Sequence, residues 1–181
     1  DNFVRFVNPN VILLAWVSEA DKDKHPIYQQ NYERLSAVYD ILKNAKDQDG
    51  KPFTLIKIPM PDLISRPVRL LADCIPNDSV QDVRIFPSSE GYRVGDLIQQ
   101  VPVSSYLNFL ITNKKILLPT YNTTENSKHK EEEVRRIFTE LYPDRELVFI
   151  DALSYNWKGG GIHCFAKQIP VRKKGNLKNK S

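Results

Sequence analysis

The feature that most constrains the fold of this 181-residue chain is a pattern that occurs twice along it. The first copy covers about residues 1–59. It consists of two apolar segments joined by a tight turn, then a polar loop, an amphipathic segment and a short apolar segment. The same order returns over about residues 104–152. Each copy predicts a ββαβ unit. Because one such unit cannot bury its apolar face alone, the repetition favours units arranged around a common axis.

Local signals in the two copies agree with this interpretation. The turn between the first two strands is expected at Asn8, Pro9 and Asn10 in one copy and at Asn113, Lys114 and Lys115 in the other. The closing strands, 54–58 and 147–151, are short and rich in branched and aromatic residues, so they are predicted to be buried.

Each copy also contains a segment with apolar residues at three- and four-residue spacing, which is typical of an amphipathic helix. In the helix expected over 28–45 the buried face consists of Tyr32, Leu35, Val38, Tyr39 and Leu42. In the helix expected over 128–143 it consists of Val134, Ile137, Phe138 and Leu141.

Between the copies lies a Pro-, Asp- and Ser-rich excursion, residues 60–103. One short helix and one hairpin are expected there. Cys74 falls inside it with no His or second Cys at metal-ligand spacing, so it is interpreted as a buried structural thiol.

The charge of the chain is concentrated at one end. The net charge is +4, but the tail 172–181 holds five basic residues and no acid, which leaves the rest of the chain at −1. Such a tail is expected to be disordered and solvated, and nucleic acid is not an expected partner.

No apolar run approaches the ~20 residues of a membrane-spanning helix. Two cysteines form no disulfide framework, which favours a reducing, cytoplasmic setting.

The segment "KGGGIHCFAKQIP", residues 158–170, raises the question of chemistry. The residues after the glycines are expected to form a strand, on which His163 and Cys164 point to opposite sides. This geometry argues against a metal site and against His163 as the base for Cys164. Nor does the glycine run have the order of a phosphate-binding loop. From the residues alone, Cys164 is either a nucleophile beyond a closely approached glycine turn or a small core residue.

A family resemblance bears on this choice. The segment "GGGIHCFAKQIP" resembles the C-terminal catalytic segment of agmatine deiminases and the related bacterial peptidylarginine deiminases. "SSYLNFLITNKKILLPTY" is similar to that family's Ser-Tyr-x-Asn-Phe segment, and "DNFVRFV" to the stretch beginning at the last residues of its Gly-His-x-Asp-Asn motif. The resemblance implies an α/β-propeller, an α/β fold of five ββαβ units around a central site. This chain is expected to supply about the C-terminal half of that ring, over residues 1–171.

The resemblance also implies roles for individual residues. Cys164 would be the nucleophile, and Asp1 would be one of the carboxylates that hold a planar, cationic guanidinium. Asn108 would lie at the substrate site, where Gly160 and Gly161 would let the loop approach the substrate. Neither a metal nor an organic cofactor is implied. The family's histidine would stand two residues before Asp1, so the chain is expected to be part of a longer protein and to be inactive alone. His25 and His129 are expected to be solvated rather than to replace it.

The resulting hypothesis is part of a hydrolase that converts agmatine and water to N-carbamoylputrescine and ammonia through an amidino-cysteine intermediate. The alternatives are a truncated or degenerate non-catalytic propeller fragment and a peptidylarginine deiminase. The expected partners are a small guanidine substrate and the missing N-terminal half. Exposed strand edges also allow a homo-oligomer.

Overall fold

The structure is a computed structural model, and it describes residues 1–69, 93, 95–122 and 124–169. The first repeat forms one three-stranded sheet. Strand β1 (Val4–Asn8) is antiparallel to β2 (Val11–Trp16), and β2 is parallel to β3 (Thr54–Pro59). A 3-10 turn, η1 (Lys22–Lys24), and helix α1 (Pro26–Asn44) connect β2 to β3.

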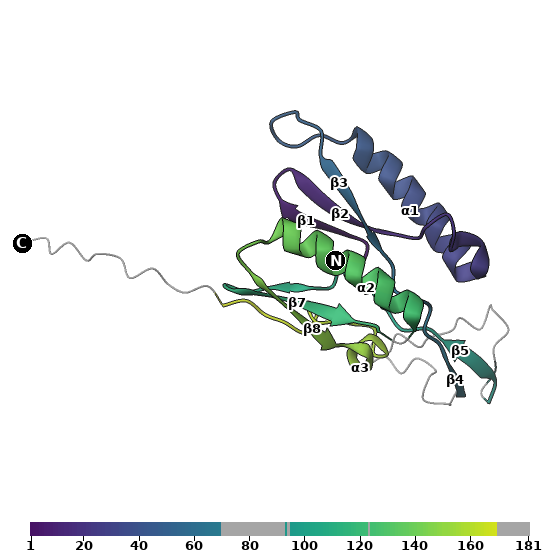
Figure 1. Ribbon diagram of the computed structural model, residues 1–181. Helices are drawn as coiled ribbons and strands as arrows, with labels where there is room; N and C mark the ends of the chain where they lie inside the picture. The colour runs from purple at the N-terminus through teal and green to yellow at the C-terminus, as the bar shows by residue number, and fades with distance from the viewer. Residues whose placement is uncertain (70–92, 94, 123, 170–181) are drawn as a thin grey trace, which may run out of the picture.

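The second repeat has the same topology. Its sheet consists of β6 (Leu110–Ile111), β7 (Lys115–Thr120) and β8 (Glu146–Asp151), with helix α2 (Glu125–Leu141) between β7 and β8. Both parallel pairs run over six residues in the same register. The ββαβ repeat expected from the sequence is therefore confirmed, and Figure 1 shows the two units next to each other.

Both long helices begin earlier than their apolar spacing predicts because capping residues precede the apolar face. His25 accepts a hydrogen bond from the Ile27 amide through Nδ1, and Pro26 occupies the first turn of α1. Thr124 accepts a hydrogen bond from the Ser127 amide at the start of α2. His25 and His129 are both exposed, as the sequence predicted.

The core lies where the two units meet. Helix α2 contacts both β3 of the first unit and β8 of its own unit, and it buries Val134, Ile137 and Phe138 as predicted. Helix α1 buries only Leu35, while the other four residues of its predicted face are partly buried against the core. The prediction that the closing strands are buried is wrong for most of their length. In β3 and β8 only Ile58 is buried, and the other residues are half-buried except for the exposed Thr54, Lys57, Glu146 and Asp151. Each of these strands stands at the edge of its sheet.

The excursion 60–103 contributes one antiparallel pair, β4 (Arg66–Arg69) with β5 (Leu97–Gln100), which matches the expected hairpin. Its described residues contain no helix, so the short helix expected there is not found among them. Cys74 and the basic tail 172–181 lie outside the described residues. No helix in the described part of the chain is long and apolar enough to cross a membrane.

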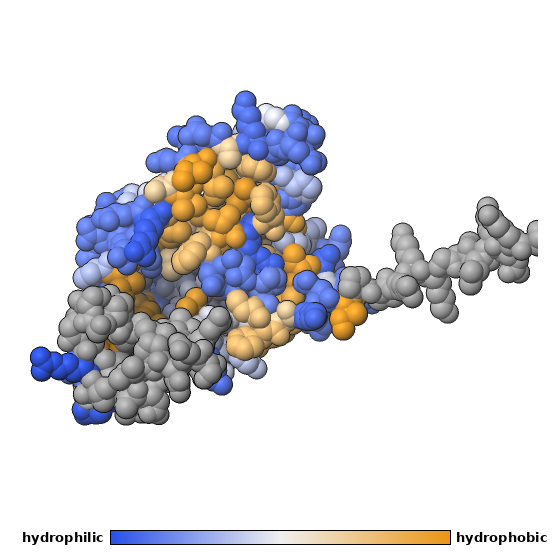
Figure 2. All heavy atoms as spheres, turned by 180° about the vertical axis from the view of Figure 1, so that it is seen from behind, coloured by the Kyte–Doolittle hydropathy of each residue, from blue (hydrophilic) through white to orange (hydrophobic). Residues whose placement is uncertain are grey.

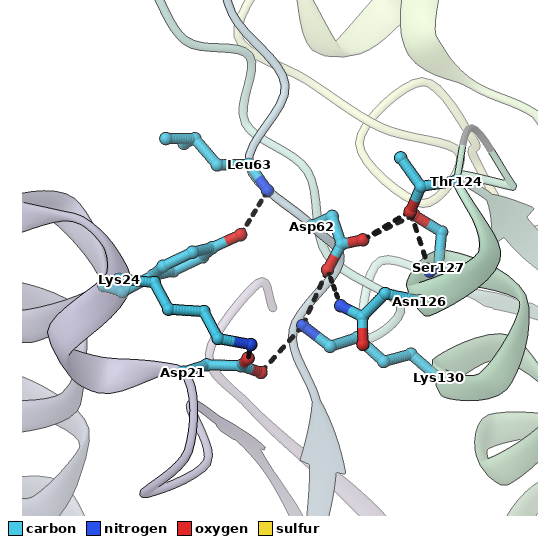
Figure 3. Close-up of polar contacts among 9 residues, drawn as sticks. Asp21, Lys24, Asp62, Leu63, Thr124, Asn126, Ser127 and Lys130 are labelled. Atoms are coloured by element: carbon cyan, nitrogen blue, oxygen red, sulfur yellow. Dashed lines mark hydrogen bonds and ion pairs between the residues drawn. The ribbon is translucent and has the colours of Figure 1, made fainter.

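A polar network joins the two units away from the core (Figure 3). Lys130 on α2 reaches between Asp21, which follows β2, and Asp62, which follows β3, at 3.0 and 2.9 Å from their carboxylate oxygens. Asp62 also accepts hydrogen bonds from the hydroxyls of Thr124 and Ser127 at the start of α2. The network fixes the position of α2 relative to the first unit.

Candidate active site

Cys164 lies on a turn and not on a strand. A short helix, α3 (Leu153–Asn156), follows β8, and residues 162–165 then form consecutive turns. The strand expected after the glycines is therefore wrong. The Cys164 side chain is exposed, which also excludes the alternative of a small core residue. Since thiolates react only where a substrate can reach the sulfur, the position is suited to chemistry.

The buried side chain of Asn108 stabilises this turn through hydrogen bonds. Its side chain is 1% exposed and comes from the segment just before β6. The Asn108 amide nitrogen donates a hydrogen bond to the Cys164 sulfur at 3.1 Å, and the Asn108 side-chain oxygen accepts one from the His163 amide at 2.8 Å. One buried carboxamide therefore contacts two consecutive residues of the turn.

Asp1 lies on the other side of the sulfur. Its carboxylate is 3.8 Å from the Cys164 sulfur, which can donate a weak hydrogen bond to it. The same carboxylate oxygen lies 2.5 Å from Nδ1 of His163. The sequence-based geometry, in which His163 and Cys164 face apart, is wrong because the backbone here is a turn, and both side chains contact Asp1.

His163 contacts the Asp1 carboxylate through Nδ1. Burial lowers the pKa of His163, and the positive charge of Arg5 lowers it further. Because a carboxylate only accepts hydrogen bonds, Nδ1 carries a proton and donates it to Asp1. His163 therefore orients the Asp1 carboxylate.

The glycines give this turn the space that it needs. A methyl group on Gly161 would stand 2.5 Å from the Asn108 side-chain oxygen, so only glycine allows the turn to lie on the carboxamide. A methyl group on Gly160 would meet the ring of Phe165, which is exposed and can move. Gly159 has a φ of +84°, a conformation that favours glycine.

The sequence-predicted site residues Asp1, Asn108, Gly160, Gly161 and Cys164 are all brought together. Asp1 belongs to the first unit, Asn108 to the second, and the Cys164 turn follows the second unit's last strand. The segments that carry Asp1 and Asn108 both lie immediately before the first strand of their unit. The site is therefore a property of how the units are arranged.

Three further residues support the site and were not singled out from the sequence. The side-chain oxygen of Asn2 accepts a hydrogen bond from the Asn108 amide nitrogen at 2.9 Å. The buried Asn156 donates to the Gly160 carbonyl at 2.8 Å. Arg5 donates to the carbonyls of Leu107 and Phe109, and its guanidinium lies 3.9 Å above the Phe109 ring.

Weak sequence signals for these three residues were present. Arg5 interrupts an apolar strand, and Asn2 precedes it next to a candidate carboxylate. Asn156 stands just ahead of the glycine run. Asn2 stands at the end of the Gly-His-x-Asp-Asn motif, but Arg5 and Asn156 belong to no motif, because each acts through a partner that is distant in sequence or through the fold of the turn. In the part of the chain that the structure describes, no group of three His, Cys, Asp or Glu residues is placed to hold a metal ion.

Comparison with known proteins identifies the family. The profile of the Porphyromonas-type peptidyl-arginine deiminases matches residues 1–170. The chain therefore belongs to the Porphyromonas-type peptidyl-arginine deiminase family. It is 31% identical over 172 residues to an agmatine deiminase of Pseudomonas putida and 30% identical over 171 residues to one of Pseudomonas fluorescens. In both cases the match covers 94% of this chain and 40% of the relative.

The solved structures agree on the fold. An agmatine deiminase of Enterococcus faecalis superposes with a TM-score of 0.58 at 23% identity, over 90% of this chain and 37% of that one. The fold is thus that of the α/β-propeller deiminases, as predicted. The chain supplies only part of that fold, since it spans 40% of the length of the relatives.

Proposed function

We propose that this chain is the C-terminal part of an agmatine deiminase-like hydrolase. The observation that carries the proposal is the exposed sulfur of Cys164, which contacts Asp1 from one unit and Asn108 from the other. The agmatine deiminases among the relatives make agmatine the first substrate to test. The overall reaction is agmatine and water to N-carbamoylputrescine and ammonia.

The chemistry is determined by the groups that surround the sulfur. The Asp1 carboxylate attracts the planar guanidinium and holds it beside Cys164. The thiolate attacks the central carbon, a carbon–sulfur bond forms, and the bond to the leaving nitrogen breaks as that nitrogen takes up a proton from a general acid and departs as ammonia. Water then attacks the amidino-thioether carbon, loses a proton to a base, and expels the thiolate to give the ureido product.

In this proposal the base is the family's histidine, which would stand two residues before Asp1, and a second carboxylate also comes from the N-terminal half. This chain alone is then inactive. Residues 1–171 form the C-terminal half of the ring, with the units at about 1–59 and 104–152, the excursion 60–103 and the Cys164 segment 158–170.

The exposed surface of the first unit supports the proposal that a further part of the protein packs against it. Strand β1 is an edge strand, and the aromatic side chains of Phe3 and Phe6 are 56% and 58% exposed. Figure 2 shows apolar side chains gathered on one face of the molecule. Strand edges and apolar surface of this kind need a cover, which the N-terminal half would supply and a homo-oligomer could extend.

The setting of the proposed reaction is the cytoplasm. Its product, a carbamoylated diamine, places the protein in polyamine metabolism and putrescine biosynthesis. The thiol and the carboxylates supply the proposed chemistry without a metal or an organic cofactor.

The test uses a preparation that contains the N-terminal half. Agmatine turnover is followed as ammonia and as ureido product, before and after treatment with iodoacetamide, in the parent and in Cys164→Ala. Turnover should fall by at least about 10³-fold in both cases, because the covalent route needs the thiolate. Cys74→Ser is the matched control and should retain turnover. Full activity of Cys164→Ala would overturn the proposal, and turnover of a peptidylarginine substrate instead of agmatine would correct the substrate.

A further inference from the structure

We propose that Asn108 does not bind the substrate but holds the Cys164 sulfur and favours its thiolate form. This inference deepens the proposed function, because it assigns the residue that prepares the proposed nucleophile. It also replaces the role implied by the family resemblance, in which Asn108 belongs to the substrate site. The new role depends on the hydrogen-bonding capacity of one side chain.

The orientation of the Asn108 carboxamide is fixed by its surroundings. The backbone N–H of His163 can only donate, so the group that faces it at 2.8 Å must be the side-chain oxygen of Asn108. The amide nitrogen of Asn108 then points toward the Cys164 sulfur. A flipped carboxamide would set two donors against each other and lose both contacts.

The donor capacity of Asn108 is already used inside the protein. An amide nitrogen carries two hydrogens. One is donated to the Cys164 sulfur at 3.1 Å and the other to the side-chain oxygen of Asn2 at 2.9 Å. Because the side chain is 1% exposed, no donor is left to face a substrate above the sulfur.

A donor at this place favours the charged form of the sulfur. A thiolate accepts hydrogen bonds more strongly than a thiol, and charge-assisted hydrogen bonds are stronger than neutral ones. The opposing influence is the Asp1 carboxylate, whose oxygen lies 3.8 Å from the sulfur and disfavours a second negative charge. Asn108 is the group in direct contact that offsets this repulsion until a cationic guanidinium arrives.

The experiment measures the reactivity of the Cys164 sulfur directly and does not depend on turnover. In this chain with Cys74→Ser, the rate of alkylation by iodoacetamide is measured from pH 5 to pH 10. Three variants are compared with that parent: Asn108→Ala, Asn108→Asp and Ser105→Ala. Asn108→Asp keeps the acceptor for the His163 amide but replaces the donor with a carboxylate oxygen. Ser105→Ala is the matched control, since Ser105 holds the same segment through Asn2 and Leu107 but makes no hydrogen bond to the sulfur.

The expected result is an upward shift of the midpoint of the alkylation profile. Asn108→Ala should shift it by about one pH unit, which slows alkylation at pH 7 about ten-fold, and Asn108→Asp should shift it further. Ser105→Ala should keep the midpoint of the parent. An unchanged midpoint in Asn108→Asp would overturn the proposal, and so would an equal shift in Ser105→Ala. If Asn108→Ala unfolds, as circular dichroism would show, Asn108→Asp decides the outcome.

The substrate provides a second, independent readout. In the preparation with the N-terminal half, loss of a thiolate-stabilising group should lower kcat and leave the KM for agmatine within about two-fold. A rise in KM at constant kcat would return Asn108 to the substrate site. If the alkylation profile depends on Asn108 but no guanidine is turned over, the proposed function fails while this inference stands.

Discussion

Two clusters of polar side chains join the two ββαβ units. They differ in how many of their charged groups have a partner of opposite charge within the protein. In the network around Lys130, the cation lies between two carboxylates, and all three side chains are less than one-fifth exposed. Around Cys164, the sulfur is exposed, and the carboxylate beside it contacts His163, whose pKa is lowered by burial, instead of a lysine or arginine.

This difference distinguishes a structural contact from a candidate site. Every charge of the network has a partner of opposite charge within the protein, which leaves little capacity for a ligand. At Cys164, by contrast, the Asp1 carboxylate still has capacity for a cation. Disturbing the network should therefore change stability, whereas disturbing the glycine turn should change the reactivity of the sulfur.

The largest expected effect is on the network. Lys130→Met removes the shared cation and leaves the carboxylates of Asp21 and Asp62 with less compensation at a mostly buried position. We expect the free energy of unfolding to fall by about 3 kcal/mol, measured by urea denaturation. Lys128→Met, which removes an exposed pair with Glu125 on the same helix, should change the free energy by less than about 1 kcal/mol. Equal losses in the two variants would contradict this interpretation of the network.

A smaller effect is expected on acidification. Burial alone would raise the pKa of Asp62, but hydrogen bonds from Thr124 and Lys130 outweigh it and lower the pKa to about 2. Because an unfolded Asp has a pKa of about 3.9, the stabilisation is present above about pH 4 and is lost as the pH falls toward 2. The loss amounts to about 2 kcal/mol.

Denaturation at pH 5, 4, 3 and 2 tests this expectation, with Asp62→Asn as the comparison. The variant should be less stable than the parent at pH 5 and should approach it at pH 2. A constant difference in the free energy of unfolding over this range would show that protonation of Asp62 does not cause the loss of stability in acid.

The smallest effect in free energy concerns the glycine turn. Gly161→Ala places a methyl group 2.5 Å from the buried Asn108 oxygen, whereas the methyl group of Gly160→Ala meets the movable ring of Phe165. In a Cys74→Ser background, Gly161→Ala should slow alkylation of Cys164 at pH 7 about ten-fold, equivalent to ~1.4 kcal/mol. Gly160→Ala should change the rate less than about three-fold. The reverse order would show that the Asn108 contact does not position the turn.

Much of the fold could be predicted from the sequence because it is local and repeated. Apolar spacing located both long helices, and the order of apolar segments located the strands before and after each helix; the capping residues account for the early helix starts. The prediction that the closing strands are buried was wrong because a run of branched and aromatic residues does not show that a strand stands at the edge of its sheet. The spacing of apolar residues does not show which face of a strand a neighbouring unit covers.

The site residues could be named from motifs, but their relations could not. Asp1 and Cys164 are 163 positions apart, and only the arrangement of the two units brings them together. The local error at His163 came from expecting a strand after three glycines, where the backbone turns instead. That turn reverses the conclusion about which way His163 points relative to Cys164.

By itself, the sequence determined the ββαβ repeat, the family and the residue types at the site. These depend on short-range periodicity and on motifs that can be read in order. The tertiary structure alone decided that Asn108 is buried beneath the sulfur with both donor hydrogens used, and that Gly161 is glycine because of Asn108. The physical reason is that hydrogen-bonding capacity and excluded volume are properties of neighbours in space, which for this turn lie more than fifty residues away.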